Sequence, residues 1–226
     1  MMGNLSRNRI VLRWIAMGRL MASPPPLRRD REEFAPLQAF RYKARMHRLF
    51  VAIRPSEPIR DLLIDAMDDS PKLGWVSDDN LHLTLRFIGE VERPLANDVA
   101  DSIGRIAFPG FELKISGVGR FDRRNGGALW AGVEPRKPVA ELAAKIDRAC
   151  VLAGLGPERR AFHPHVTLAR YRRDGRAEAE AFEQRHATLA STVFEVDRFI
   201  LFESHLSRHG AHYEEVAAYP LKLSDC

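Results

Sequence analysis

The alternation of strand and helix signals from residue 48 onward is the feature that most constrains the fold. Arg48–Ile53 is typical of a strand, and the apolar positions that follow Ser56 recur at helical spacing. Further strands are predicted at 81–88, 111–118, 128–133, 166–170, 193–202 and 213–217, and further helices at 94–106, 139–153 and 177–189. The turn residues Arg124–Gly127 favour a hairpin and therefore antiparallel pairing. This order of elements predicts an α+β domain rather than a doubly wound one.

The distribution of charge separates the first 45 residues from the remainder of the 226-residue chain. Residues 1–45 hold ten basic and three acidic side chains, a net charge of +7, whereas the remainder carries −2. A proline run at 24–26 and the lack of a periodic pattern predict a poorly ordered basic extension before a domain at 46–226. Met46 is a candidate start residue, and an Arg-rich targeting helix is the alternative for the extension. The high isoelectric point belongs to the extension, so it does not indicate a nucleic-acid-binding stripe.

Cysteine usage and hydropathy indicate a soluble protein of a reducing compartment. Cys150 and Cys226 lie far apart in the sequence, so no disulfide framework is expected, and Cys150 is predicted to be a core residue. No uninterrupted apolar run reaches the ~20 residues that span a bilayer. We therefore expect a cytoplasmic protein without a membrane segment.

Two His-x-Thr motifs fall on predicted strands, His82-Leu83-Thr84 and His165-Val166-Thr167. Each threonine is followed by a leucine, and the two motifs occupy corresponding places in the two halves of the pattern. Residues i and i+2 of a strand project from the same face, so each motif places an imidazole beside a hydroxyl. If the two strands pair, two imidazoles and two hydroxyls face one another.

Two imidazoles that face one phosphate suit the hydrolysis of a cyclic phosphodiester without a metal ion or other cofactor. One imidazole takes a proton from water and the other gives a proton to the leaving ribose oxygen. The unperturbed pKa of histidine lies near neutrality, which suits both transfers. The threonine hydroxyls can donate hydrogen bonds to the non-bridging oxygens as negative charge develops on them.

On these motifs the chain resembles the 2′-5′ RNA ligase-like branch of the 2H phosphoesterase superfamily, the bacterial RNA 2′,3′-cyclic phosphodiesterases. The resemblance covers nearly all of residues 46–226. Its matching segments are Arg48–Ile53, His82–Gly89, Leu129–Val133, Phe162–Arg170, Glu203–Leu206, Gly210, Tyr213 and Tyr219–Leu221. One His-x-Thr motif alone would be a weak signal, whereas this ordered series is a specific one.

The resemblance implies a bilobal α+β fold of two antiparallel-sheet lobes with pseudo-two-fold symmetry and outer helices. It implies that His82 and His165 form the acid-base pair, and that Thr84 and Thr167 donate to the phosphate. We favour His82 as the general acid and His165 as the general base, a division that the sequence leaves open. The remaining implied site residues are Arg170, which would approach the phosphate or nucleotide, and Phe50, which would border the base.

The same resemblance implies the partners and the product. The substrate would be RNA that ends in a 2′,3′-cyclic phosphate, the product would carry a 2′-phosphate, and the enzyme would be a monomer. A 2′-5′ RNA ligase and a cyclic phosphodiesterase for small nucleotides remain alternatives. A rival of another class is an RNA-binding module without catalysis, which would be marked by a broken motif, and both motifs are whole.

Other clusters of polar residues have simpler interpretations. His163 and His165 could hold a metal and a looser cluster stands at 205–212, but no carboxylate or cysteine lies at ligand spacing. We interpret His163 as a residue of the pocket rim and the later cluster, His205, His209 and His212, as part of a solvated loop. The arginine-rich segments 123–124 and 172–176 are expected to be exposed turns, with guidance of an RNA backbone as the alternative. The tryptophans at 75 and 130 are expected in the core.

Overall fold

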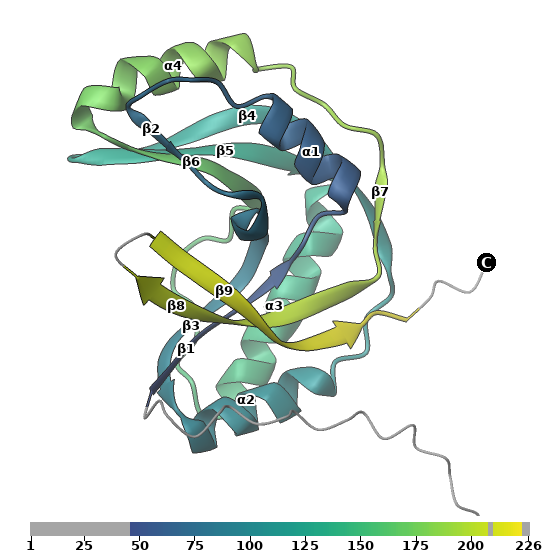
Figure 1. Ribbon diagram of the computed structural model, residues 1–226. Coiled ribbons are helices and arrows are strands. Elements are labelled where there is room, and N and C mark those ends of the chain that lie inside the picture. The colour runs from purple at the N-terminus through teal and green to yellow at the C-terminus, as the bar shows by residue number, and fades with distance from the viewer. Residues whose placement is uncertain (1–45, 208–209, 223–226) are drawn as a thin grey trace, which may run out of the picture. The chain divides into compact units, whose positions relative to one another are not determined.

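The computed structural model describes residues 46–207 and 210–222, and the expectations for residues 1–45 lie outside this range. A nine-stranded sheet dominates the described part (Figure 1), in the order β7-β4-β5-β6-β3-β1-β8-β9, with β2 paired to β6. The strands are β1 Met46–Ile53, β2 Leu73–Trp75, β3 Leu83–Glu92, β4 Phe111–Arg123, β5 Gly126–Glu134, β6 His165–Arg172, β7 Phe194–Val196, β8 Arg198–Ser207 and β9 Gly210–Pro220. The helices are α1 Glu57–Asp65, α2 Arg93–Gly104, α3 Arg136–Leu152 and α4 Arg176–Arg185, with short 3-10 turns η1 Asp78–Asn80 and η2 Arg173–Gly175.

The named strands pair antiparallel throughout the described part, which confirms the α+β prediction. Strands β1, β3, β8 and β9 form one half of the sheet, and β2, β4, β5, β6 and β7 form the other. The halves meet at β3 and β6 through the pair Leu83↔Val166. Each half thus contributes one His-x-Thr segment to this junction.

Three of the helices pack against the two halves of the sheet. α2 and α3 pack on each other and against β3, whereas α4 packs against β4, β5 and β6. One cluster of buried side chains runs through both halves, from Leu49 on β1 to Phe182 on α4. Cys150 on α3 belongs to this cluster and is fully buried, as predicted. Among the described residues, none of the helices has both the length and the apolar character that crossing a membrane requires.

The strand predicted at 193–202 is wrong, because the chain turns there at Asp197. The residues before Asp197 form β7 beside β4, and the residues after it form β8 beside β1, in the other half of the sheet. The carbonyl of Asp197 accepts a hydrogen bond from the Leu221 amide at 2.7 Å, which holds this break in place. The adjacent polar residues Asp197 and Arg198 interrupt the apolar alternation at this point, a signal that the prediction of one long strand passed over.

Smaller differences concern the ends of elements. β3 does not end at Gly89 but passes through it to Glu92, with φ of +86° at the glycine. α4 ends at Arg185 rather than at residue 189, and the short edge strand β2 was not predicted. The hairpin between β4 and β5 is confirmed, with Arg123 paired to Gly126 across a two-residue turn.

Candidate active site

The register between β3 and β6 determines how the two motifs meet. Leu83 pairs with Val166, and both side chains are buried. If the register is continued by one residue each way, His82 stands opposite Thr167 and Thr84 opposite His165. These four side chains share the face away from the core, because neighbours along a strand alternate. The two imidazoles are therefore diagonal neighbours, at a spacing of ~7–8 Å that leaves room for one phosphate between them.

The two imidazoles are held in the same way. Nδ1 of His82 lies 2.8 Å from the carbonyl oxygen of Asn80, and Nδ1 of His165 lies 2.5 Å from that of His163. A carbonyl oxygen only accepts, so each Nδ1 carries the proton and donates it. Each Nε2 is left for a substrate, and each ring is fixed by a group two residues earlier.

Burial disfavours the positively charged form of both imidazoles. It lowers the pKa of His82 to about 4 against the hydrogen bond to Asn80, and the charges of His165 and Arg170 lower it further. Burial also lowers the pKa of His165, with smaller contributions from the charges of His163 and Arg170. The electrostatic influence of His165 on His82 agrees with the diagonal placement. In the free protein both rings are therefore neutral at pH 7.

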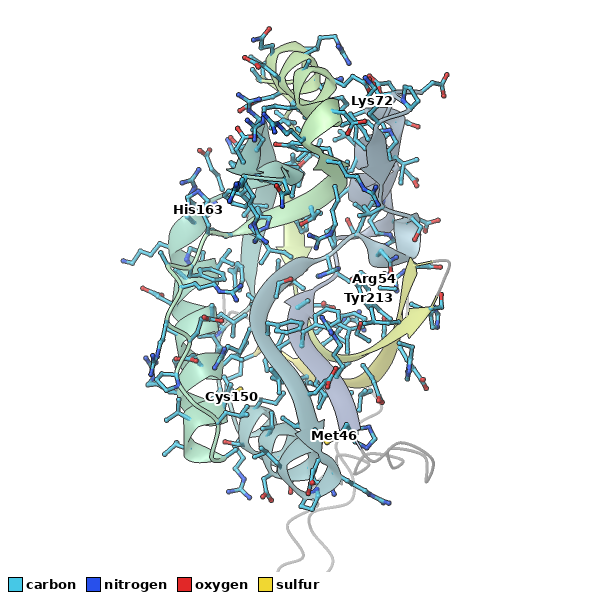
Figure 2. The ribbon with its side chains drawn as sticks, turned by 90° about the vertical axis from the view of Figure 1, so that its left-hand side faces the viewer. Met46, Arg54, Lys72, Cys150, His163 and Tyr213 are labelled. Atoms are coloured by element: carbon cyan, nitrogen blue, oxygen red, sulfur yellow. The ribbon has the colours of Figure 1, made fainter. Side chains whose placement is uncertain are left out.

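Aromatic rings surround His82 on the first half. The ring centroids of Phe50 and Tyr213 lie 4.9 Å and 5.2 Å from that of His82. Phe50 is only 3% exposed and stacks on Phe202, so its place is beside the imidazole rather than on an open surface for a base. Figure 2 shows Tyr213 and His163 on the two sides of β3. The contacts with Phe50 and Tyr213 restrict the rotation of the His82 ring.

His165 has its own aromatic neighbours on the second half. Phe121 lies edge-on at 5.0 Å between centroids, and Trp130 lies at 6.1 Å. Trp130 is half-buried and also contacts His163 at 5.9 Å, so the expectation that it is a core residue is wrong. Trp75 does pack on the core, with its ring 4.9 Å from that of Phe182. Sequence alone gave no reason to separate the two tryptophans.

A bulge in each strand brings a residue five places after the histidine onto the same face. In β6, Thr167 pairs with Trp130 while Ala169 pairs with Leu129, so Leu168 is an extra residue in the ladder. This insertion resets the alternation of side chains and turns Arg170 outward on the site face. Arg170 lies beside Gly74 of β2 in the register.

β3 contains the equivalent bulge. Thr84 pairs with Ala52 while Arg86 pairs with Val51, so Leu85 is the extra residue. Phe87, five residues after His82, is turned outward and is 45% exposed. The guanidinium of Arg48 lies 5.3 Å from its ring centroid. Sequence reasoning missed Phe87, although its spacing from His82 equals that of Arg170 from His165.

These residues open into one hollow of about 780 Å³. Its lining includes Thr84, Phe87, Phe121, Arg123, Glu158, Arg160, His163, His165, Thr167 and Arg170. His82 and Phe50 are not part of this lining. The structure thus brings His165, both threonines and Arg170 to one hollow, and His82 lies on the same face of the sheet beside it.

The histidines that we did not assign to catalysis lie in different surroundings. His163 is exposed on the rim of the hollow, as interpreted. His205 and His212 face each other in the β8–β9 hairpin, so the interpretation of this cluster as a solvated loop is wrong for them. His209 lies outside the described residues. No group of three or more histidine, cysteine, aspartate or glutamate residues in the described ranges is arranged to hold a metal ion.

The sequence contains a third His-x-Thr, His186-Ala187-Thr188, which lies outside the predicted strands. The structure places His186 at the end of α4, where its ring lies 4.3 Å from that of Phe182. It does not line the hollow. The motif therefore indicates a site only when it lies on a strand, and His186 offers a natural control for the other two.

Comparison with known proteins identifies the family. Residues 54–208 match the model of the 2′-5′ RNA ligase superfamily. The chain belongs to this superfamily. Its relatives include an RNA 2′,3′-cyclic phosphodiesterase of Geobacillus stearothermophilus, 31% identical over 160 residues that cover 70% of this chain and 50% of that protein. An RNA 2′,3′-cyclic phosphodiesterase of Escherichia coli is 36% identical over 127 residues, 54% of this chain and 71% of that protein.

Solved structures agree with this placement. The crystal structure of Escherichia coli LigT complexed with NADP+ has a TM-score of 0.66 and 29% identity, and the match covers 79% of this chain and 99% of that one. LigT has also been crystallised with 3′-AMP and with phosphate, at TM-scores of 0.62 and 0.60. The fold is therefore that of the LigT-like 2H phosphoesterases. The chain spans about half the length of two of its curated relatives, those of Geobacillus stearothermophilus and Aeropyrum pernix.

Proposed function

We propose that this protein hydrolyses the 2′,3′-cyclic phosphate at the end of an RNA to a 2′-phosphomonoester. The observation that carries the proposal is the antiparallel pair Leu83↔Val166, with which each motif presents an imidazole whose Nε2 is left for substrate. Relatives across several bacteria and archaea are named for this activity. Escherichia coli LigT, which has been crystallised with phosphate and with 3′-AMP, supports a phosphate site on this fold.

The reaction needs two proton transfers on opposite sides of the phosphorus. A water oxygen attacks phosphorus while Nε2 of one imidazole takes its proton. The bond from phosphorus to the ribose 3′ oxygen breaks, and that oxygen takes a proton from Nε2 of the other imidazole. The 2′ ester bond remains, so the product is a 2′-phosphate. Each transfer contributes ~10² to 10⁴ in rate.

Thr84 and Thr167 donate hydrogen bonds to the non-bridging oxygens on which negative charge develops. Arg170 supplies a positive charge on the same face, brought there by the bulge at Leu168. Phe87 occupies the corresponding place on β3 and offers an exposed ring at the edge of the hollow. The site thus combines donors to the phosphate with an apolar surface beside them, as a nucleotide requires.

We assign His82 as the acid and His165 as the base, the division that we favoured from the sequence. Since burial lowers the pKa of both rings, the acid must gain its proton when the anionic substrate is present. The negative phosphate favours the imidazolium beside it and so offsets the cost of burying that charge. After each cycle the base holds a proton and the acid lacks one, and exchange with water resets the pair.

The test uses RNA with a 2′,3′-cyclic phosphate end, assayed in EDTA, and identifies the product isomer. His82→Ala and His165→Ala should each lower kcat by ~10³ or more, and the double variant should be scarcely worse, because the pair acts in one transition state. His186→Ala is the matched control, a His-x-Thr histidine off the site, and should keep wild-type turnover. A 3′-phosphate product, or loss of activity in EDTA that a divalent ion restores, would contradict the proposal.

A further inference from the structure

Exposed arginines gather around the active-site hollow and along one path that leads away from it. Arg123, Arg160 and Arg170 line the hollow itself. Arg172 at the end of β6 and Arg173 in η2 continue from it. All five are exposed. Arg160 interacts electrostatically with Glu158, whereas the other four form no ion pair with any residue of the described ranges.

Some arginines on other exposed surfaces are engaged by carboxylates, whereas Arg136 and Arg148 of α3 are exposed without such an ion pair. Arg185 lies 2.5 Å from Asp68, and Arg198 lies 3.0 Å from Asp197. Exposed positive charges that have no carboxylate partner are available to an external anion. What sets Arg170, Arg172 and Arg173 apart from the unpaired arginines of α3 is their position along the hollows beside the proposed phosphate site, which indicates that this anion is part of the substrate.

The hollows beside these arginines are continuous with the catalytic one. A second hollow of about 450 Å³ shares Arg170 and Tyr171 with it, and a third of about 580 Å³ shares Asn125. The second and third in turn share Arg172 and Asp174. A path therefore leads from Thr167 past Arg170 to the turn after β6.

The length of this path suits several phosphates. From Thr167 to Arg172 the strand extends ~17 Å at about 3.3 Å per residue. A stacked nucleic-acid strand places a phosphate every ~3.4 Å of its axis, so the span exceeds one nucleotide. The arginines lie on the surface of open hollows, which fits a single strand whose backbone tracks a positive groove.

The turn that carries Arg173 has a fixed backbone. Gly175 is buried, and a Cβ atom added to it would lie 2.7 Å from the carbonyl oxygen of Lys72. Close packing of η2 against this segment holds the turn in one conformation, so little order has to be gained when an anion binds. Asp174 is the carboxylate of the second and third hollows among the described residues, and it repels the same anion.

We propose that Arg172 and Arg173 bind backbone phosphates of the RNA nucleotides upstream of the cyclic end, which reach them past Arg170. The inference rests on the proposed function, because it extends the substrate out of the catalytic hollow. It makes the enzyme selective for an RNA end over a free cyclic nucleotide. The selectivity comes from charges that do not take part in the chemical step.

The experiment compares Arg172→Ala/Arg173→Ala with the wild type on two substrates, a short oligoribonucleotide with a 2′,3′-cyclic phosphate end and a nucleoside 2′,3′-cyclic monophosphate. The double variant should lose about tenfold in kcat/KM on the oligonucleotide at low salt and nothing on the mononucleotide. The salt dependence of kcat/KM on the oligonucleotide should weaken by about 1.4 in log-log slope, since each lost single-strand phosphate contact removes ~0.7. Asp174→Asn should raise oligonucleotide kcat/KM.

Arg136→Ala/Arg148→Ala is the matched control, because it removes two exposed arginines from α3, away from these hollows. If the control variant loses as much kcat/KM on the oligonucleotide, the effect is one of net charge alone. If Arg172→Ala/Arg173→Ala loses as much kcat/KM on the mononucleotide as on the oligonucleotide, the two arginines act in the chemical step or in folding. Either result would contradict the inference. If the double variant keeps the wild-type kcat/KM on the oligonucleotide, Arg172 and Arg173 do not contact the RNA and the inference is wrong. A wild-type enzyme inactive on both substrates would overturn the proposed function instead.

Discussion

His82 and His165 are related by more than their motif, since each ring donates from Nδ1 to the carbonyl two residues before it. The donor and acceptor are set by the backbone, so no carboxylate is needed to select the tautomer. Without a carboxylate partner, burial is not offset and the pKa of each ring falls. The position of each imidazole beside the core thus explains both its fixed orientation and its lowered pKa.

The pH dependence of kcat/KM should reflect these lowered pKa values. The active pair carries one proton, and that state is most populated between the two pKa values, both below 6.5. We expect a bell-shaped profile with its maximum on the acid side of 6.5 and a fall as pH rises through neutrality. Initial rates with a cyclic-phosphate oligonucleotide at constant ionic strength would measure it. A maximum above pH 7 would show that the rings are not desolvated in this way.

The burial of His82 should also make folding stability depend on pH. Above pH 6.5 the ring is neutral in both states, whereas between 6.5 and about 4 only the unfolded chain takes up the proton. Stability should therefore decrease as pH falls through this window, by about 3 kcal/mol from this residue. His82→Gln should flatten the urea-unfolding free energy over the window, while Arg136→Ala should run parallel to the wild type. Parallel curves for both variants would mean that His82 is solvated.

At the scale of elements, the sequence predicted the strands that carry both motifs but not the bulges that orient the side chains after each motif. Periodicity identifies a strand, but an extra residue such as Leu168 or Leu85 leaves the local pattern apolar and unremarkable. Phe87 therefore looked like one more core position. The break at Asp197 coincides with the adjacent polar residues Asp197 and Arg198, but where each piece goes could not be predicted, because the partners of β7 and β8 are far away in sequence.

The bulge of β3 has a second consequence in Arg86, which faces inward and is 8% exposed. Its Nε lies 2.8 Å from Asp147 of α3, its Nη1 3.1 Å from Glu158, and its Nη2 donates to the carbonyl of Gly156 at 2.6 Å. Glu158 lines the active-site hollow. Arg86 therefore ties the strand of the first motif to the helix and loop that lead to the second.

Removal of Arg86 should be costly for this reason. Arg86→Ala leaves two carboxylates without their cation in a partly buried place, and we expect a loss of ~3–5 kcal/mol in the free energy of unfolding. Arg86→Lys should restore only part of it, because an ammonium cannot reproduce the fork of contacts. Urea denaturation of these variants beside Arg148→Ala, an exposed arginine of α3, gives the comparison. A loss no larger than that of Arg148→Ala would mean that the cluster contributes little.

At the scale of the whole described domain, the proposed catalytic pair depends on two halves that share few backbone contacts. β3 and β6 pair through Leu83↔Val166, and this junction sets the spacing of the imidazoles. The halves are joined more firmly below the sheet, where the core cluster is continuous and Arg86 reaches α3. The strand pair thus sets the spacing of the two imidazoles, and the shared core beneath it holds the two halves together.

This arrangement predicts that the two halves unfold together. Because Leu83, Leu129 and Ile146 belong to one buried cluster, neither half can keep its apolar surface covered when the other is lost. Far-UV circular dichroism, which reports every element, and tryptophan fluorescence of a Trp14→Phe variant, whose remaining Trp75 and Trp130 lie in one half, should give coincident transitions in urea. Leu83→Ala should move both transitions to lower urea by the same amount, in keeping with a loss of ~2–5 kcal/mol for a buried leucine. Two separated transitions would show that the halves fold independently, and the spacing of His82 and His165 would then have to be fixed by the single strand pair at Leu83 and Val166.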